Sequence, residues 1–142
     1  MHQLIYRLLP ALLLALLTCS AYAGTCTVPG DYASVGDAVS DLACTSIELA
    51  SGRYAGQTLT RSIALIGAGT HSTVIEGEQG QPAISVQGNG VQVSLQGMRL
   101  ESGNGSETVF QTDGGGEIVF ASDIQIGLGN ELFSNGFEDL NP

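Results

Sequence analysis

The sequence contains no tryptophan and no lysine, and only four arginines stand against 14 acidic residues. One arginine, Arg7, belongs to residues 1–23, so the remainder carries a formal charge of 3 − 14 = −11. Nucleic acid and anionic membrane surfaces would repel such a chain at close range, which excludes them as expected partners. Disorder is excluded as well, because 43% of the residues are hydrophobic and only 13% are charged. The 142 residues suffice for one domain.

Residues 1–23 have the composition of a secretory signal peptide. Arg7 precedes an apolar run of about ten residues, and the segment ends on Ala21-Tyr22-Ala23. The run is shorter than the roughly 20 residues of a membrane-spanning helix, so no transmembrane segment is expected. The protein is therefore expected to be exported, to the periplasm, the cell surface or the medium. A lipoprotein signal cut before Cys19 is the alternative.

Export determines how the cysteines are interpreted. Cys26 and Cys44 form an even pair once Cys19 is removed, and an oxidising compartment favours a disulfide between them. A metal site lacks further ligands, because His71 is the one histidine after the signal and no CxxC motif occurs. No cofactor is expected. Ca²⁺ would be held loosely at most, since no alternating Asp-x-Asp loop exists.

Short strand-like triplets recur along the chain at a nearly constant spacing. Four of them end at Leu49, Ile75, Leu100 and Ile126, and these position numbers differ by 26, 25 and 26 in turn. Two other series keep almost the same spacing: Leu59, Ile84 and Phe110, and the pair Val93 and Val119. A fixed period of this length is typical of repeat architectures, in which each repeat is one supersecondary unit.

Each repeat contains runs of alternating apolar and polar residues, separated by glycine, asparagine or serine. Such runs predict β-strands with one buried face, which strands this short cannot bury alone. Stacking the repeats gives an all-β fold, a parallel β-helix of about four coils over residues 46–129. The triplet ends then form one internal ladder, and the glycines occupy the corners. The alternative is an antiparallel sandwich with hairpin turns at Asn89-Gly90 and Asn104-Gly105.

Residues 24–45 predict an N-terminal cap for this stack. The apolar face of a short helix would comprise Val35, Ala38, Val39 and Leu42. Ser34 precedes that helix as a candidate N-cap. An open solenoid end exposes an apolar cross-section and unpaired strand edges, so this helix is expected to cover it. The disulfide between Cys26 and Cys44 would tie the two ends of the cap together.

Four segments carry a family resemblance: residues 28–32, 47–54, 62–69 and 73–77. They are similar to the start of the pectate-lyase-like family of parallel β-helices. In that family a capping helix, a strand ending in a Gly-x-Tyr turn and a strand ending in Gly-x-Gly follow one another in this order. The resemblance implies a right-handed, single-stranded parallel β-helix of about four coils with a small N-terminal capping helix.

The resemblance also implies a catalytic chemistry, and the residues of this sequence can be compared with what that chemistry requires. Enzymes of that family hold calcium with acidic side chains on one sheet face, and a nearby arginine abstracts a proton from a uronate sugar. The arginines outside the signal are Arg53, Arg61 and Arg99. The outward column predicted around Arg99 consists of Glu48, Val74, Arg99 and Gln125. This column lacks three clustered carboxylates, so we predict no catalytic residue, no cofactor-binding residue and no metal ligand.

The charged residues have a structural interpretation instead. Arg99 is expected in an exposed ion-pair ladder with Glu76 and Glu101, and Arg53 in a structural role at its turn. Glycoside cleavage would need two carboxylates about 5–9.5 Å apart. Glu76 and Glu101 are one pair, and Asp113 and Glu117 are another. With 14 acids on a small surface, one such pair is expected by chance.

The carboxyl-terminal tail, residues 130–142, contains Phe133-Ser134-Asn135-Gly136-Phe137-Glu138. It resembles a short Phe-x-(Asn/Asp)-Gly-Phe-Glu ending found on many otherwise unrelated secreted bacterial proteins. A second interpretation is that its apolar residues fold over the last coil.

Taken together, the sequence is interpreted as an exported β-helix module without catalysis of its own. Its role would be structural or the binding of carbohydrate or a cell-surface component. The alternative is a minimal or truncated polysaccharide lyase or glycoside-active enzyme, because family members that cleave sugars have more coils. A shortened gene product that has lost its active coils is a third interpretation.

Overall fold

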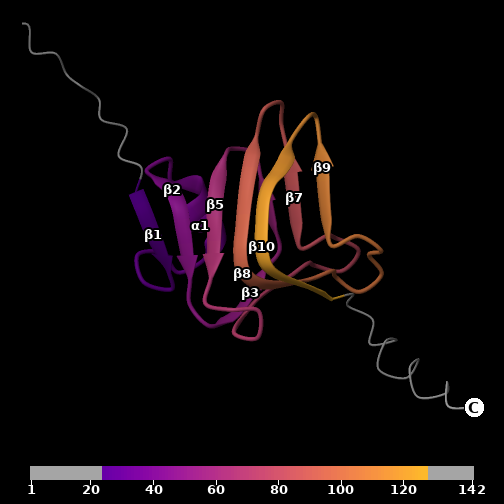
Figure 1. Cartoon of the computed structure of the whole chain (residues 1–142), viewed down its shortest axis with the longest axis horizontal. Helices are drawn as coiled ribbons and strands as arrows, with labels where there is room; N and C mark the ends of the chain where they lie inside the picture. Colours follow the sequence, from indigo (N-terminus) through magenta and orange to yellow (C-terminus); the bar gives the residue numbers. More distant parts are fainter. Residues whose placement is uncertain (1–23, 128–142) are drawn as a thin grey trace, which may run out of the picture.

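The computed structural model describes residues 24–127, which form a parallel β-solenoid of about four turns (Figure 1). The elements are β1 (Gly24–Val28), α1 (Val35–Ser40), β2 (Cys44–Leu49), β3 (Gly52–Ala55), β4 (Gln57–Leu59), β5 (Ile63–Gly67), β6 (Thr73–Glu76), β7 (Ile84–Gln87), β8 (Gln92–Glu101), β9 (Phe110–Asp113) and β10 (Glu117–Gly127). The predicted signal and the predicted tail lie outside the described residues.

The strands form three faces. Face 1 consists of β1, β2, β5 and the first halves of β8 and β10. Face 2 consists of β3, β6 and the second halves of β8 and β10. Face 3 consists of β4, β7 and β9. All strand pairs among residues 24–127 are parallel, which confirms the predicted β-helix and excludes the antiparallel sandwich.

Two long strands pass from face 1 to face 2 through a sharp corner. In β8 this corner is Gly97, with φ at +64°, and in β10 the corner residue is Asp123, with φ at +49°. Glycine adopts this left-handed conformation without a steric penalty from Cβ. The prediction that glycines occupy corners is confirmed at Gly97.

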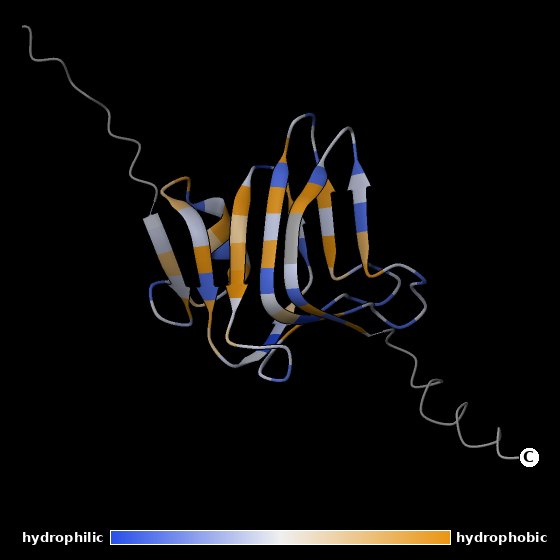
Figure 2. Cartoon of the chain, in the orientation of Figure 1, coloured by the Kyte–Doolittle hydropathy of each residue, from blue (hydrophilic) through white to orange (hydrophobic). Residues whose placement is uncertain are grey.

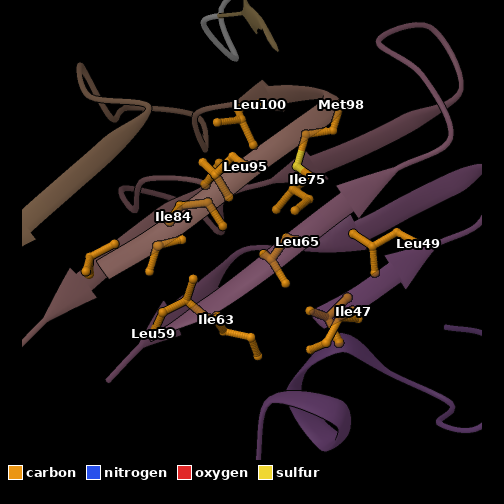
Figure 3. Packing of buried hydrophobic residues seen from close by; sticks show 14 of the residues in the cluster. Ile47, Leu49, Leu59, Ile63, Leu65, Ile75, Ile84, Leu95, Met98 and Leu100 are labelled. Atoms are coloured by element: carbon orange, nitrogen blue, oxygen red, sulfur yellow. The ribbon is translucent and has the colours of Figure 1, made fainter. Parts of the chain in front are cut away.

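The core runs along the inside of the stack. Figure 2 shows hydrophobic and hydrophilic residues alternating along the strands, as expected when one side of each strand is buried. On face 1, Ile47, Leu65 and Leu95 occupy successive register positions and are each at most 1% exposed. Figure 3 shows these side chains packed with those of the other faces. Because each strand is short, the apolar face of one coil is buried only by its neighbours.

The predicted internal ladder is correct for three of its four members. Ile75, Leu100 and Ile126 occupy one register position on face 2. Leu49 does not precede them, because β2 lies on face 1 and Leu49 pairs with Gly67. Tyr54 pairs with Ile75 and so takes the fourth place in the ladder. The sequence distance between these two residues is shorter than the predicted period. The first coil is shorter because a single residue separates β3 from β4, whereas seven separate β6 from β7.

Two further register predictions also need correction. Ile84 pairs with Phe110 as predicted, but Leu59 pairs with Val86, two residues further along the strand. Val119 does not stack on Val93. The register of β10 shifts next to Val119, and its side chain is 56% exposed. A bulge of this kind places one extra residue in the strand, which the constant period could not reveal.

Helix α1 covers the amino-terminal end of the stack. The Ser34 side chain accepts a hydrogen bond from the Asp37 N–H at 3.1 Å, which confirms the N-cap. Val35 and Ala38 are buried in the core. Leu42 is 80% exposed, so its predicted place on the buried face is wrong. The helix ends at Ser40, and the chain then turns away from the core before Leu42 is reached.

The predicted disulfide between Cys26 and Cys44 is present. It joins β1 to the start of β2, which are neighbours in face 1. The segment predicted as a cap, residues 24–45, therefore already contributes a strand to the solenoid. Within the described part of the chain, no helix is long and apolar enough to cross a membrane.

Tyr32 and Asp41 join the turn before α1 to the turn after it. The Asp41 carboxylate accepts a hydrogen bond from the Tyr32 hydroxyl and another, at 2.8 Å, from the Ala43 N–H. The bond from Tyr32 and then the bond from Ala43 lower the pKa of Asp41 below its ordinary value of 3.8. The folded state therefore favours the ionised carboxylate.

This contact predicts an acid-sensitive contribution to stability. Because the pKa of Asp41 is lower in the folded state than in the unfolded state, its contribution to stability is complete at pH values above the unfolded-state pKa. That contribution is lost as the pH falls through the folded-state pKa. We expect Asp41→Asn to make the melting temperature less dependent on pH below about pH 4. Glu107→Gln, at an exposed loop residue, is the matched control. Identical pH profiles for wild type and Asp41→Asn would contradict this role of the carboxylate.

Candidate functional site

Face 2 carries the main charged cluster of the described chain. Arg53 Nη1 lies 2.7 Å from Glu76 Oε2 and 3.2 Å from Glu101 Oε2. Arg99 Nε lies 2.8 Å from Glu101 Oε1, close enough for an ion pair but without hydrogen-bond geometry. Glu76 and Glu101 are direct register neighbours on β6 and β8, as predicted. The cluster therefore joins three successive coils, β3, β6 and β8.

The ion pairs of this cluster affect the basicity of Arg53. The negative charge of Glu101, followed by the hydrogen bond to Glu76, raises the pKa of Arg53, which makes this arginine a poorer proton acceptor. Both carboxylates are paired with the same guanidinium nitrogen. The outward column contains Arg53, Val74, Arg99 and Gln125, and Arg53 stands where Glu48 was predicted. Arg53 and its two carboxylates form an ion-pair ladder in which the Arg53 and Glu76 side chains are exposed and that of Glu101 is 14% exposed.

The other candidate residues are separate from this cluster. Asp113 accepts a hydrogen bond from Gln111 at 2.9 Å, and Glu117 accepts one from Gln92 at 3.0 Å. His71 lies exposed in the turn between β5 and β6, where Thr70 Oγ1 is 3.1 Å from its Nδ1. Among residues 24–127, no group of three histidine, cysteine, aspartate or glutamate side chains could hold a metal ion.

Arg61 has a structural contact that sequence reasoning did not predict. Its Nε donates to the Val39 carbonyl at 2.9 Å, and its Nη2 donates to the Asp41 carbonyl at 2.7 Å. These carbonyls lie at the end of α1, where helix carbonyls lack partners within the helix. Arg61 thus fastens the capping helix to the first full coil.

Removing this arginine should therefore destabilise the cap. We expect Arg61→Ala to lower the free energy of unfolding by about 2 kcal/mol, because two charged hydrogen bonds are lost at a half-buried position. Arg53→Ala is the control, and it should lower the free energy of unfolding less than Arg61→Ala does, because the Arg53 side chain is 62% exposed. Urea unfolding measures both. An Arg61→Ala effect no larger than that of Arg53→Ala would contradict the contact's importance.

A concave surface of the described chain lies over face 3. It is a hollow of about 540 Å³, lined by Gly56, Gln57, Thr58, Glu78, Gln81, Pro82, Ser85, Gln87 and Gln111. Its strand residues come from β4, β7 and β9, and the other lining residues are Gly56 and part of the loop between β6 and β7. We call this surface the face 3 groove.

Polar side chains are arranged regularly in the face 3 groove. Thr58, Ser85 and Gln111 are register partners across the three strands, so they lie about 4.8 Å apart in the backbone. Gln87 lies two residues after Ser85 and so projects from the same side of β7. Ser85 is only 8% exposed, whereas Gln87 and Gln111 are exposed. The result is a shallow surface of hydroxyl groups and amides.

The groove offers neutral hydrogen-bonding groups with little charge. Each glutamine amide provides two donors and one acceptor oxygen, and each hydroxyl both donates and accepts. Glu78 is the one charged residue among the lining residues. Asp113 lies beside them as the register partner of Gln87, and it accepts a hydrogen bond from Gln111. This surface was not predicted from the sequence. The alternation in Ile84-Ser85-Val86-Gln87 is a signal that Ser85 and Gln87 lie on the outside, but only the register of β4, β7 and β9 brings the polar residues together.

Comparison of the chain with protein-family models, with curated proteins and with solved structures found no match. The fold and the groove define the class of molecule, a short parallel β-solenoid with a neutral polar groove on one face.

Proposed function

We propose that this protein is an exported binding module for a neutral polysaccharide, without catalysis of its own. The observation that carries the proposal is the face 3 groove, in which amides and hydroxyls are repeated from coil to coil. A polymer of hydroxyl-rich sugars presents donors and acceptors at regular intervals. A regular array of neutral groups can therefore bind it along its length.

The charge of the protein favours a neutral ligand over a uronate polymer. The chain carries −11 formal charges beyond residue 23, and no arginine lines the groove. An acidic polymer would be repelled by the field of the whole molecule and would find no cation to pair with in the groove. A uronate ligand, which the pectate-lyase-like resemblance implies, is therefore less well supported than a neutral polysaccharide.

Export belongs to the same proposal and is supported by the signal-like residues 1–23 and by the disulfide. Disulfides persist in oxidising compartments, and an exported protein encounters extracellular polysaccharides there. A minimal lyase or glycoside-active enzyme is the alternative outcome of the experiments below.

The groove can be tested by removing two of its exposed amides. We expect the double variant Gln87→Ala/Gln111→Ala to bind a neutral polysaccharide about thirtyfold more weakly, because two hydrogen-bonding groups worth about 1 kcal/mol each are lost. Affinity electrophoresis in gels containing the polymer measures this difference. Gln125→Ala, on β10 outside the groove, is the matched control and should bind as wild type does. Equal binding by the double variant and the control would place the binding site elsewhere.

A further inference from the structure

The last coil exposes apolar side chains at positions whose register partners in the preceding coil face the core. Ile126 is 55% exposed, although it stacks on Leu100, which is 1% exposed, and on Ile75 beyond it. Phe110 is 45% exposed, although it stacks on the fully buried Ile84. These residues are exposed because no described residue is stacked on them. Among residues 24–127, the carboxyl-terminal end of the solenoid is thus an uncovered cross-section of the core.

The opposite end of the solenoid is covered. There, α1 buries Val35 and Ala38 against the first coil, and Arg61 and the disulfide hold it in place. Figure 1 shows β1 and α1 at one end of the stack and β9 and β10 at the other. In addition, β9 and β10 each pair with a strand on one side only within the described chain. An end with both apolar side chains and unpaired backbone groups needs a cover.

We propose that residues 128–142 of the same chain cover this end. The segment follows directly on Gly127, the last residue of β10, so it begins at the rim of the uncovered cross-section. Fully extended, it reaches about 50 Å, several times the spacing between packed sheets. Its apolar residues are Leu128, Leu132, Phe133, Phe137 and Leu140. They match the apolar character of the exposed Phe110 and Ile126.

Charge favours the chain's own segment over a second copy of the protein. Residues 128–142 contain Glu131, Glu138 and Asp139 and no lysine or arginine, a formal charge of −3. An end-to-end dimer would instead bring together two chains of −11 each, counted beyond residue 23. Self-repulsion therefore opposes the dimer more strongly than it opposes the segment. The segment is also tethered, so its local concentration at the end is high.

The absence of tryptophan provides a direct test. Phe133→Trp in the exported full chain introduces a single indole, whose emission reports its own environment. We expect blue-shifted emission and a several-fold lower rate of acrylamide quenching than in Gln79→Trp, an exposed loop position. Combining Phe133→Trp with Ile126→Ser should raise the quenching rate, because part of the covered surface is lost. Phe137→Trp gives a second measurement should Phe133→Trp fail to fold.

Sedimentation at two protein concentrations separates the possible occupants. Protection of the indole in a monomer, independent of concentration, supports the proposal. Solvent-like emission in a monomer overturns it, since the segment then leaves the end open. Protection that appears only with dimer formation also overturns it and assigns the end to a second copy. Each result is independent of polysaccharide binding, because the face 3 groove is not involved.

Discussion

Gly103→Ala is expected to lower the free energy of unfolding by about 3 kcal/mol or more, because the added methyl group has no space. A Cβ at residue 103 would overlap the carbonyl group of Glu78 and would also approach the Gly77 oxygen to 2.8 Å. Gly103 further donates its N–H to the Gln81 carbonyl at 3.0 Å. Two neighbouring coils are thus in backbone contact here, and a side chain must push them apart.

Gly52→Ala is the matched control for this substitution. Gly52 lies three positions after Leu49, and Gly103 lies three positions after Leu100, so the sequence predicts the same corner role for both. At residue 52 the nearest atoms that a Cβ would meet belong to the Tyr54 ring, at 3.6 Å, which is ordinary contact. We expect a change within about 0.5 kcal/mol, measured by urea unfolding. Equal losses for both variants would contradict the close coil contact at Gly103.

Removing the disulfide is the other change with a large expected effect. The variant Cys26→Ala/Cys44→Ala should lose about 3 kcal/mol, because the bridge closes a loop of 18 residues and restricts the unfolded chain. In a domain of this size, that loss lowers the melting temperature by about 15 °C. Differential scanning calorimetry of the exported protein measures the difference.

A reductant provides the control for the disulfide experiment. Reductant should lower the melting temperature of the wild type toward that of the double variant and leave the double variant unchanged. The wild-type mass should rise by two hydrogen atoms on reduction. If the reductant changed neither the mass nor the melting temperature of the wild type, that result would contradict the disulfide.

The fold could be predicted because the repeat period records the stacking of coils. The spacing from Ile75 through Leu100 to Ile126 was predicted correctly, because β8 and β10 have nearly the same length and bend. The same period failed at Leu49, which lies on another face. Turn lengths differ between the early coils, and hydrophobic alternation alone does not record how many residues a turn contains.

The candidate site was harder to predict than the fold. Sequence reasoning followed charged residues and correctly predicted that Glu76 and Glu101 are neighbours, with an arginine between coils. The arginine that bridges them is Arg53, however, because β3 rather than β2 precedes β6 on face 2. The face 3 groove consists mainly of glutamine, serine and threonine side chains, which occur on the outside of many strands. Only their register across three strands distinguishes them from an ordinary polar surface.

We expect this short solenoid to bind neutral polysaccharide and not to cleave it, and one experiment tests both expectations. The exported full chain is incubated with neutral polysaccharides and, in parallel, with uronate polymers and calcium, while binding and product release are recorded. We predict retention by at least one neutral polymer and no unsaturated or shortened product from any polymer. Reproducible unsaturated product from a uronate polymer, or no binding to any neutral polymer, would contradict the proposed function.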